Sequence, residues 1–568
     1  MAPDQSERPV QRPEPPLDDP DLLSALLRRL FSSPLYRLAL RSRPPRSFFA
    51  VAPDSWPGDA ANGERMLMGE FIARGRSGRI DLPNDPAWQR RGADPQWLAA
   101  LHSFDWLRDL RDCASQLAAN MAAAKIDEWI DQQAGWSELA WAPDVLADRV
   151  VNWIRHYDFL ASGATEGFAS RYVASLAVQL RHLRRVARSP LAGGRLLRIL
   201  KALIFADLAF LRDHGHYESG LISSLARLRK FLPRYVLADG VVAERSPRMQ
   251  LRALRDLIDI RAALTSADRP GPADLEAAIE RMAPMLRFFR HGDGGLALFN
   301  GSQEGDRAMI DLVLARSGSG APPPREAPYS GFQRLAAGGT YVIIDAGSPP
   351  SRGLDLDAHA GTLSFEFGAG RERIVVNCGS FAGSDPEWRK AMRFTAAHST
   401  LVIDNVNSSE IGELGSIEYR AGNVPTQRQE TAGAVWIEAQ HDGYKSLYGA
   451  VHRRRLYLSS DGVDLRGEDT LAGVDGKRIV DEGLTFAIRF HLHPTVKASM
   501  VQSGAAAILR LPSGKGWRMR ASGGSMNIVE SVYLGIDGQV RRTEQIVLIG
   551  PLPPEGCNLK WAFARLDG

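Results

Sequence analysis

The sequence predicts an α+β multidomain protein, in which an array of helices is followed by an antiparallel β-sandwich. Apolar residues recur every three or four positions from about Leu22 to Arg290, the spacing of one helix face. Beyond a stretch rich in Ser, Gly and Pro the period changes to two, as in strands with one buried face. We therefore predict a disordered tail (1–20), a helical domain (21–316), a linker (317–328) and a β-sandwich domain (329–568).

The individual helices are visible in the spacing of their apolar residues. Val173, Leu176, Leu180 and Leu183 fall on one face of a helix, and the leucines of 196–203 and 251–257 repeat this pattern. Short breaks that contain Gly or Pro separate such segments. Successive helices joined by short loops form hairpins, which assemble as a bundle, a solenoid or a closed toroid.

The strands of the second half are indicated by alternation and by turn residues. The segment 486–492 alternates apolar and polar side chains. Asp461-Gly462 lies between two short apolar runs, which is a strong hairpin signal, and 509–519 reads as a second hairpin around 512–515. Many short strands of this kind are typical of a large antiparallel sandwich.

Composition and charge exclude several classes of protein. The chain is 44% hydrophobic and 24% charged, which argues against a disordered, fibrous or coiled-coil protein. Its 70 basic and 66 acidic residues leave a net charge of +4, too small for a protein that binds nucleic acid without sequence preference. The three cysteines are far apart, so they predict neither a disulfide framework nor a CxxC metal site.

The sequence also contains information on the cellular location of the protein. No segment is long and apolar enough for a membrane-spanning helix. The first residues are polar and rich in Pro, without the apolar stretch of a secretory signal peptide, so we predict a cytoplasmic protein. The sequence leaves the oligomeric state open.

The densest polar cluster of the β half contains Asp357, His359, Asn377 and His398. Strand alternation would place Asp357 and His359 on the same face of the sheet. Two histidines with an oxygen ligand between them in the sequence form a plausible set for a divalent metal ion. The alternative is that each histidine bonds to the backbone of a neighbouring strand.

The order of three segments in this cluster resembles the C-terminal β-domain of the heparinase II/III family of polysaccharide lyases. These segments are 358–367 (AHAGTLSFEF), 375–379 (VVNCG) and 395–404 (TAAHSTLVID). Upstream, Trp141-Ala142-Pro143 and the run Glu244-Arg245-Ser246-Pro247 look like landmarks of that family's (α/α) toroid. The resemblance covers nearly the whole chain from about residue 90 and implies a toroid followed by the sandwich.

The resemblance also implies an activity. Lyases of this family cleave uronate-containing polysaccharides by β-elimination, in which the substrate carboxylate is neutralised, a base removes the adjacent proton and an acid protonates the leaving oxygen. The family provides these groups as an Asn-His pair, a Tyr and the first His of a strand motif. It binds its metal through a second His, an Asp and a later His. An acidic polysaccharide or oligosaccharide is the expected partner.

The sequence departs from the family at most of these positions. Gly194-Arg195 replaces the Asn-His pair, Met249-Gln250 replaces the Tyr-His pair, and Asp357 replaces the first strand His. The surviving metal ligands implied by the resemblance are His359 and His398, with Asn377 in place of the Asp, and they would hold one divalent ion, Zn or Ca.

These departures leave two hypotheses open. In the first, the chain remains a lyase in which Arg195 neutralises the carboxylate and Tyr444 and Asp357 act as acid and base. In the second, it is a degenerate member that binds a glycan or a protein partner in the same cleft. A glycoside hydrolase on the helical scaffold would need two cleft carboxylates, and no sequence feature identifies such a pair.

Further residues are candidates for substrate binding, each with a structural alternative. Glu244 and Arg245 could contact the substrate or form a helix cap with an ion pair. Arg489 and His491 share a strand face, which is also typical of an exposed polar surface. His441 precedes Tyr444 in the segment 441–444. Because family lyases meet polymers outside the cytoplasm, the resemblance implies the periplasm or cell envelope as the alternative address.

Overall fold

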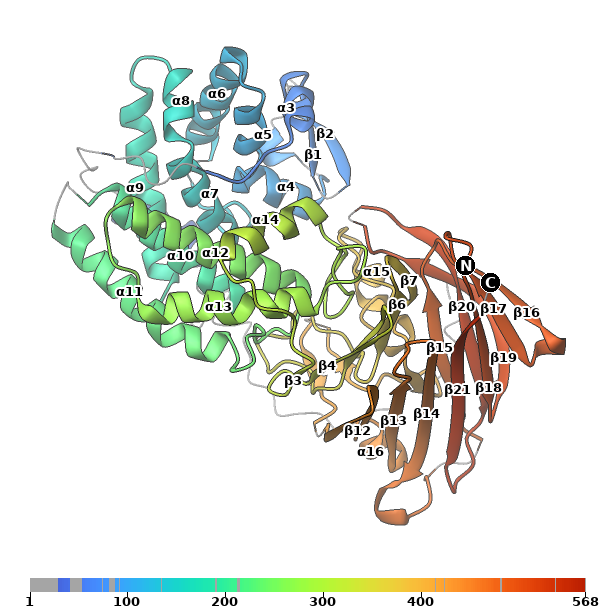
Figure 1. Cartoon of the computed structure of the whole chain (residues 1–568). Helices are drawn as coiled ribbons and strands as arrows, with labels where there is room; N and C mark the ends of the chain where they lie inside the picture. Colours follow the sequence, from blue (N-terminus) through green and yellow to red (C-terminus); the bar gives the residue numbers. More distant parts are fainter. Residues whose placement is uncertain are drawn as a thin grey trace.

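The computed structural model confirms the predicted order of a helical half followed by a β half (Figure 1). It describes residues 29–40, 48, 54–73, 75–80, 87–90, 92–133, 135–188, 192–211, 215–413, 415–422, 424–480, 483–536 and 538–566. The predicted tail at 1–20 lies outside these residues. The helical half ends with α14 (Arg307–Ser317), and the first strand of the β half, β3 (Glu326–Ala327), follows a short segment without regular structure.

The helical half is built from antiparallel neighbours joined by short loops. Helix α10 (Gly193–Ala209) packs against α7 (Pro143–Arg155), α11 (Gly215–Tyr235) and α12 (Pro247–Ser266). Leucines identified in the sequence are buried, among them Leu176 on α9, Leu200 on α10 and Leu257 on α12. The remaining helices are α2 (Pro34–Leu40), α3 (Ala60–Leu67), α4 (Pro95–Ser103), α5 (Leu107–Asp112), α6 (Gln116–Gln132), α8 (Tyr157–Ser162), α9 (Phe168–Val186) and α13 (Ala273–Phe288).

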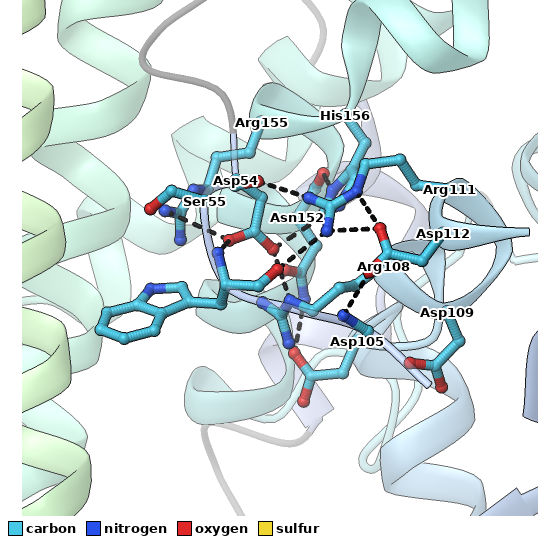
Figure 2. Close-up of polar contacts among 12 residues, drawn as sticks. Asp54, Ser55, Asp105, Arg108, Asp109, Arg111, Asp112, Asn152, Arg155 and His156 are labelled. Atoms are coloured by element: carbon cyan, nitrogen blue, oxygen red, sulfur yellow. Dashed lines mark hydrogen bonds and ion pairs between the residues drawn. The ribbon is translucent and has the colours of Figure 1, made fainter. Parts of the chain in front are cut away.

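A buried network of charges connects the segment 54–56 to the surrounding helices, and Figure 2 labels its members Asp54, Arg108 and Arg155. The carboxylate of Asp259 accepts hydrogen bonds from Trp56 Nε1 (2.7 Å), Lys201 Nζ (2.6 Å) and both terminal nitrogens of Arg155 (3.0 Å each). Asp54 accepts from Arg108 Nε at 2.6 Å. We call these six residues the interior network. It joins α5, α7, α10 and α12 around a single chain segment.

Two large antiparallel sheets form the sandwich. One has the order β19-β20-β15-β7-β6-β5-β4-β3, with β8 paired to β15, and the other has the order β11-β12-β13-β14-β21-β18-β17-β16. Apolar side chains from both sheets make one core, where Phe365 stacks on Trp561 at 5.3 Å between ring centroids. The strands are β4 (Phe332–Ala337), β5 (Thr340–Asp345), β6 (Phe365–Ala369), β7 (Glu372–Val376), β8 (Leu401–Ile403), β11 (Thr426–Thr431), β12 (Ala434–His441), β13 (Ala450–Leu458), β14 (Asp464–Gly473), β15 (Thr485–Leu492), β16 (Lys497–Val501), β17 (Ala506–Arg510), β18 (Gly516–Ser522), β19 (Ser525–Tyr533), β20 (Arg541–Pro551) and β21 (Cys557–Leu566).

The strand predictions hold where a turn signal and alternation coincide. The hairpin at Asp461-Gly462 joins β13 to β14, the second predicted hairpin joins β17 to β18, and the alternating segment is β15. In contrast, Asp357 and His359 do not lie on a strand. The structure places them in the loop between β5 and β6, so the strand-face argument for this pair was wrong.

The two halves are connected by buried polar contacts between the segment after α13 and the sandwich. His291 Nε2 lies 2.5 Å from Glu366 Oε2, and Arg373 Nε donates to Asp293 Oδ2 at 3.0 Å. Tyr533 donates its hydroxyl to Glu304 Oε1 at 2.7 Å. Because all these groups are largely shielded from water, the contacts fix one half against the other.

Candidate functional site

A cleft of about 690 Å³ separates the helical half from the sandwich. Its helical wall comes from the start of α7, the start of α10 and the start of α12 with the residues before it. Its sandwich wall comes from the loop between β5 and β6 and from the segment between β7 and β8, which contains the short helix α15 (Pro386–Ala391). A cleft of this size between two parts of a chain is the usual place for a ligand site.

The helical wall is organised by Glu244. Its Oε1 accepts a hydrogen bond of 2.6 Å from the backbone N–H of Gly194, in the first turn of α10. A side chain at Gly193 would meet this carboxylate at 2.3 Å, so the Gly193-Gly194 pair permits the approach. Burial raises the pKa of Glu244. Glu244 therefore bonds to the first turn of α10 and lines the cleft, whereas α12 is capped by Ser246 and Arg245 pairs with Asp345, so the predicted cap with a Glu244–Arg245 ion pair was wrong.

Arg195 follows these glycines and lines the same wall. Its side chain is exposed and forms no hydrogen bond or ion pair with any described residue. The neighbouring Arg198 instead faces Asp144 and Asp148, each at 3.4 Å. Burial would raise the pKa of Asp144, but Arg198 and then Arg195 outweigh it and hold that pKa below its usual value. The structure thus places Arg195 exposed at the helical wall of the cleft.

On the sandwich wall, Asp357 lies exposed opposite the helical half. A side chain at Gly301, which has φ of +72°, would meet Asp357 Cβ at 2.9 Å, so the two loops touch here. Asn300 connects the loops further, because its amide donates to Arg245 O at 2.9 Å and accepts from the N–H of His359 at 3.0 Å. Asp357 and Arg195 therefore line one cleft from opposite walls.

His359 and His398 are adjacent, as predicted, but they bond to each other. The N–H of Gly301 donates to His359 Nε2 at 3.0 Å, and His398 Nδ1 donates to Phe394 O at 2.7 Å. The remaining contact, 2.9 Å between His359 Nδ1 and His398 Nε2, then requires the proton on His359 Nδ1. Burial lowers the pKa of His359 well below its usual range and that of His398 to about 4, consistent with neutral rings.

This pattern does not fit a divalent metal ion. A histidine ligates through an unprotonated ring nitrogen, and both such nitrogens of the pair already accept a hydrogen bond. Asn377 Oδ1 accepts from the N–H of Ser399 at 3.0 Å, and its buried amide nitrogen is a donor that cannot ligate a cation. Among the described residues no group of three or more His, Cys, Asp and Glu side chains has metal-binding geometry. No chemistry at this site is therefore assigned to a metal.

Several predicted site residues lie elsewhere. Tyr444 is completely buried in the sandwich core, with its hydroxyl 3.3 Å from Leu401 O, so its assignment as a cleft acid or base was wrong. Arg245 is buried and donates to Ser330 O, Ser348 O and Asp345, which makes it a joint between the halves and not a ligand contact.

The three remaining candidates belong to the sandwich. His441 is buried against His452, at 3.2 Å between ring nitrogens. His491 is buried between Ser531 Oγ (2.8 Å) and Ala396 O (3.0 Å). Arg489 is half-buried and donates to Gln545 Oε1 at 3.3 Å. None of the three lines the described part of the cleft, so the structure does not support their assignment to substrate binding there.

Other residues of the cleft were not predicted from the sequence. Arg389 and Lys390 on α15 line it, are exposed, and form no side-chain bond with any described residue. Arg393 also lines it but is bound to Ala358 O at 2.7 Å and Asp355 O at 3.1 Å. The dipeptide Asn300-Gly301 was the available signal for the turn that meets Asp357. Nothing in the local pattern of α15 distinguishes it from an ordinary surface helix.

Comparisons with known proteins agree with this architecture. Residues 319–562 match the family model described as heparinase II/III-like, C-terminal. FtsZ-localized protein C of Caulobacter vibrioides (strain NA1000 / CB15N) is 32% identical over 556 residues, which cover 95% of this chain and 94% of that protein. None of the helices in the described ranges combines the length and hydrophobicity needed to cross a lipid bilayer.

Two solved lyase structures share the fold. The crystal structure of heparinase III has a TM-score of 0.74 at 13% identity and covers 94% of this chain and 89% of its own. A mutant of the heparan sulfate lyase HepC from Pedobacter heparinus has a TM-score of 0.63 at 17% identity, with 96% and 89% covered. These matches confirm the predicted fold class. Together with the full-length relative and the family match, they show that the chain belongs to the heparinase II/III-like family.

Proposed function

We propose that the cleft binds an acidic glycan without cleaving it by the family's elimination chemistry. The observation that carries this proposal is the set of side chains in the described cleft lining. It contains three cations without a protein partner, Arg195, Arg389 and Lys390, but no tyrosine, and its one histidine has both ring nitrogens engaged. Such a cleft can hold a carboxylate or sulfate, and it lacks the tyrosine and the free histidine nitrogen that the family uses for proton transfer.

The structure weakens the replacements that would rescue elimination. Tyr444 lies in the sandwich core, so its phenol cannot protonate a leaving group in the cleft. Asp357 is exposed to solvent at the sandwich wall. An arginine such as Arg195 binds a carboxylate by two parallel hydrogen bonds, which favours retention of the ligand even when the reaction is lost.

A lyase remains the second candidate, because Arg195 and Asp357 do line the same cleft from opposite walls. In that reaction Arg195 would neutralise the uronate carboxylate and Asp357 would remove the adjacent proton. The electron pair would then form the C=C bond of an unsaturated uronate as the glycosidic oxygen departs with a proton from solvent.

One experiment separates these candidates. The purified chain is mixed with heparan sulfate, hyaluronan, alginate and polyglucuronate, and both binding heat and ultraviolet absorbance of an unsaturated uronate are followed. Binding with a flat absorbance trace supports the proposal. A rise in absorbance would instead establish the lyase reaction, and the absence of binding to every polymer would contradict both.

The full-length relative also suggests an address. Its printed name describes a protein localized with FtsZ, and the 32% identity extends over 95% of this chain. We extend that localization to this chain. A fluorescent fusion that follows FtsZ in dividing cells would support the extension, whereas a uniform cytoplasmic signal or a signal in the periplasm would contradict it.

A further inference from the structure

The outer face of the eight-stranded sheet carries a row of aromatic and basic side chains that takes no part in the cleft. Strand pairing places Trp436 on β12 opposite Tyr457 on β13, and Tyr457 opposite Arg466 on β14. The row continues through Ala562 on β21 to Arg520 on β18. At each position a sequence neighbour packs in the sandwich core, so all five side chains point outward. We call these five residues the outer row.

The aromatic end of the outer row, Trp436 with Tyr457, is accessible to a partner. Trp436 has 45% of its surface exposed, and its ring centroid lies 4.5 Å from that of Tyr457. The guanidinium carbon of Arg466 lies 5.6 Å from the Tyr457 centroid. Among the described residues, Trp388 is the only other exposed tryptophan. Exposed Trp, Tyr and Arg side chains side by side are the residue types that contribute most to binding at protein interfaces.

The free charge of this face is positive. Each outward carboxylate of β12 and β14 lies within ion-pair distance of an outward cation, in the pairs Glu438–Arg455, Asp464–Arg466 and Glu468–Lys560. Arg518 and Arg520 on β18 instead form no hydrogen bond or ion pair with any described residue, and no carboxylate occupies an outward position of β16, β17 or β18. A partner that fits this face is therefore acidic and has an apolar part for the aromatic end.

The chain itself contains a segment with both properties. Residues 13–23 (PEPPLDDPDLL) contain four carboxylates, four prolines and no basic residue. This segment belongs to the predicted tail and lies outside the described residues. Sequences rich in Pro favour the polyproline II conformation, which packs its prolines on exposed aromatic rings at a low cost in entropy. The prolines thus suit the aromatic end, and the carboxylates suit the arginines of β18.

The lengths of the segment and of the outer row agree. In the order of the sheet, Arg520 lies four strand spacings from Trp436, or about 19 Å at about 4.8 Å per strand. A polyproline II helix rises about 3.1 Å per residue, so Pro15 and Asp21 are also about 19 Å apart. With Pro15 on the aromatic end, Asp21 therefore reaches the arginines of β18.

The segment has to come from a second copy of the chain. The first described helix, α2, packs on α9, where Tyr36 Oη lies 2.6 Å from His182 Nδ1. Figure 1 places α9 and the strands β14, β21 and β18 at opposite ends of the molecule. The eight steps from Asp21 to Arg29 span at most about 29 Å, whereas a compact chain of this length is roughly 60 Å across. The tail therefore does not reach the outer row of its own chain.

We propose that residues 13–21 of one copy dock on the outer row of a second copy. The prolines pack on Trp436 and Tyr457, and the aspartates pair with the arginines of β18. The two partners use different surfaces, so the contact is heterologous and joins copies head to tail. This self-association goes beyond the proposed function of the cleft and does not depend on it.

A labelled peptide tests the contact on the full chain. The dissociation constant of a fluorescein-labelled peptide of residues 11–23 is measured by fluorescence anisotropy. We expect Trp436→Ala to weaken binding about tenfold, the loss of one ring contact, and Trp436→Phe to recover most of it. Arg518→Gln combined with Arg520→Gln should also weaken binding about tenfold. Trp388→Ala is the matched control and should bind as the wild type does, because its ring lies on α15.

A second peptide isolates the role of charge. It has the same length and prolines, but amides replace the four carboxylates, in the changes Glu14→Gln, Asp18→Asn, Asp19→Asn and Asp21→Asn. We expect this neutral peptide to bind at least about tenfold more weakly than the acidic one at low salt, and the difference to shrink as salt is added.

Mixing two variants shows whether the contact joins different copies. The four amide substitutions are made in the full chain, which removes the acidic tail and keeps the outer row. Trp436→Ala keeps the tail and removes the outer row. We expect sedimentation velocity to show self-association of the wild type that increases with concentration, and little of either variant alone. The equimolar mixture should associate, because one variant supplies the tail and the other supplies the face.

The proposal is overturned if Trp436→Ala binds the acidic peptide as the wild type does, or if Trp388→Ala loses as much affinity. A wild type that stays monomeric and binds no peptide overturns it as well. So does a mixture of the two variants that stays monomeric while the wild type associates. Binding of the wild type to phosphatidylglycerol vesicles that is lost in Trp436→Ala, without any binding of the peptide, would assign the face to a membrane surface instead.

Discussion

The interior network and the cleft contain the same types of charged side chain, but these are buried and bonded to one another in the network and exposed in the cleft. In the network, the Asp259 carboxylate accepts four hydrogen bonds from three basic or aromatic side chains and is almost fully buried. In the cleft, Arg195, Arg389 and Lys390 are exposed and have no side-chain partner among the described residues. The charges of the network are hydrogen-bonded to one another, whereas the exposed cations of the cleft are open to a ligand.

This difference shows how to separate stability from binding in a protein rich in Arg and Asp. A buried charge that loses its partner is costly, so changes in the network should reduce the free energy of unfolding. An exposed cation contributes little to folding, so changes in the cleft should reduce affinity and leave stability intact.

The largest effect is expected at Asp259. Asp259→Asn removes the carboxylate that Lys201 and Arg155 share and leaves each of these buried cations with one acidic partner, Asp256 or Asp54, so we expect the free energy of unfolding to fall by about 3 kcal/mol. Urea denaturation followed by circular dichroism measures this fall. The matched change in the cleft, Asp357→Asn, should leave the midpoint unchanged because that side chain is exposed. Equal loss in the two variants would remove the distinction between the regions.

The network should also make the helical half sensitive to acid. Burial would raise the pKa of Asp54, but Arg155 and then Arg108 hold it at about 2, against an ordinary value of 3.8. Because the folded pKa is the lower one, this contribution of about 2 kcal/mol is complete above pH 3.8 and is lost as the pH falls toward 2.

Other carboxyls act in a separate pH range. Burial raises the pKa of Asp109 and of Asp207 to about 6, so these two groups reduce stability as the pH rises from 3.8 toward 6. Unfolding free energies measured by urea titration from pH 2 to 7 resolve the two ranges. In Asp54→Asn the loss below pH 3.8 should be smaller, and an unchanged acid limb would show that Asp54 does not carry it.

A smaller change in free energy is expected at Arg195, and it concerns ligand binding and not folding. Arg195→Gln removes a charged donor from the helical wall, so we expect affinity for polyglucuronate to fall about tenfold, with the same thermal midpoint. Arg510→Gln is the matched control, because Arg510 is also an exposed arginine but lies on β17, outside the cleft. If both arginine variants bind equally weakly, the loss reflects net charge and not a site.

The sequence was sufficient for the fold where local signals agree with long-range packing. Leucines at helical spacing were buried on α9, α10 and α12, and Asp461-Gly462 joined two paired strands. The alternating pattern gave a wrong prediction at Asp357. The residues around it alternate as in a strand, but the backbone forms a loop that packs against the turn at Gly301. A loop that is shaped by another part of the chain has no local period.

The site was predicted only in part for a related reason. Arg195 and Arg245 are both arginines beside family landmarks, yet one is exposed in the cleft and the other is buried between the halves. Their difference depends on partners more than 80 residues away, since Arg245 donates to Ser330 O and Ser348 O. Arg389 and Lys390 line the cleft only because α15 lies opposite the helical wall, which their local sequence does not indicate.

A small effect is expected at Tyr444, which the sequence placed in the cleft and the structure places in the sandwich core. Tyr444→Phe keeps the ring that packs in the sandwich and removes the hydroxyl near Leu401 O, so we expect a loss of about 1 kcal/mol in unfolding free energy. Glycan affinity should be the same as in the wild type. A loss of affinity in Tyr444→Phe, with little change in stability, would return this phenol to the functional site.

The smallest expected effect is none at all, at the histidine pair. A metal that binds only the folded chain raises the thermal midpoint with its concentration. Because His359 Nε2 and His398 Nε2 already accept hydrogen bonds, a metal would have to displace the N–H of Gly301 and separate two buried rings. We therefore expect the midpoint to be the same with zinc, with calcium and with chelator. A stoichiometric ion in the purified chain that is lost together in His359→Ala and His398→Ala would show that the pair opens to bind metal and that the hydrogen-bonded arrangement is only its resting state.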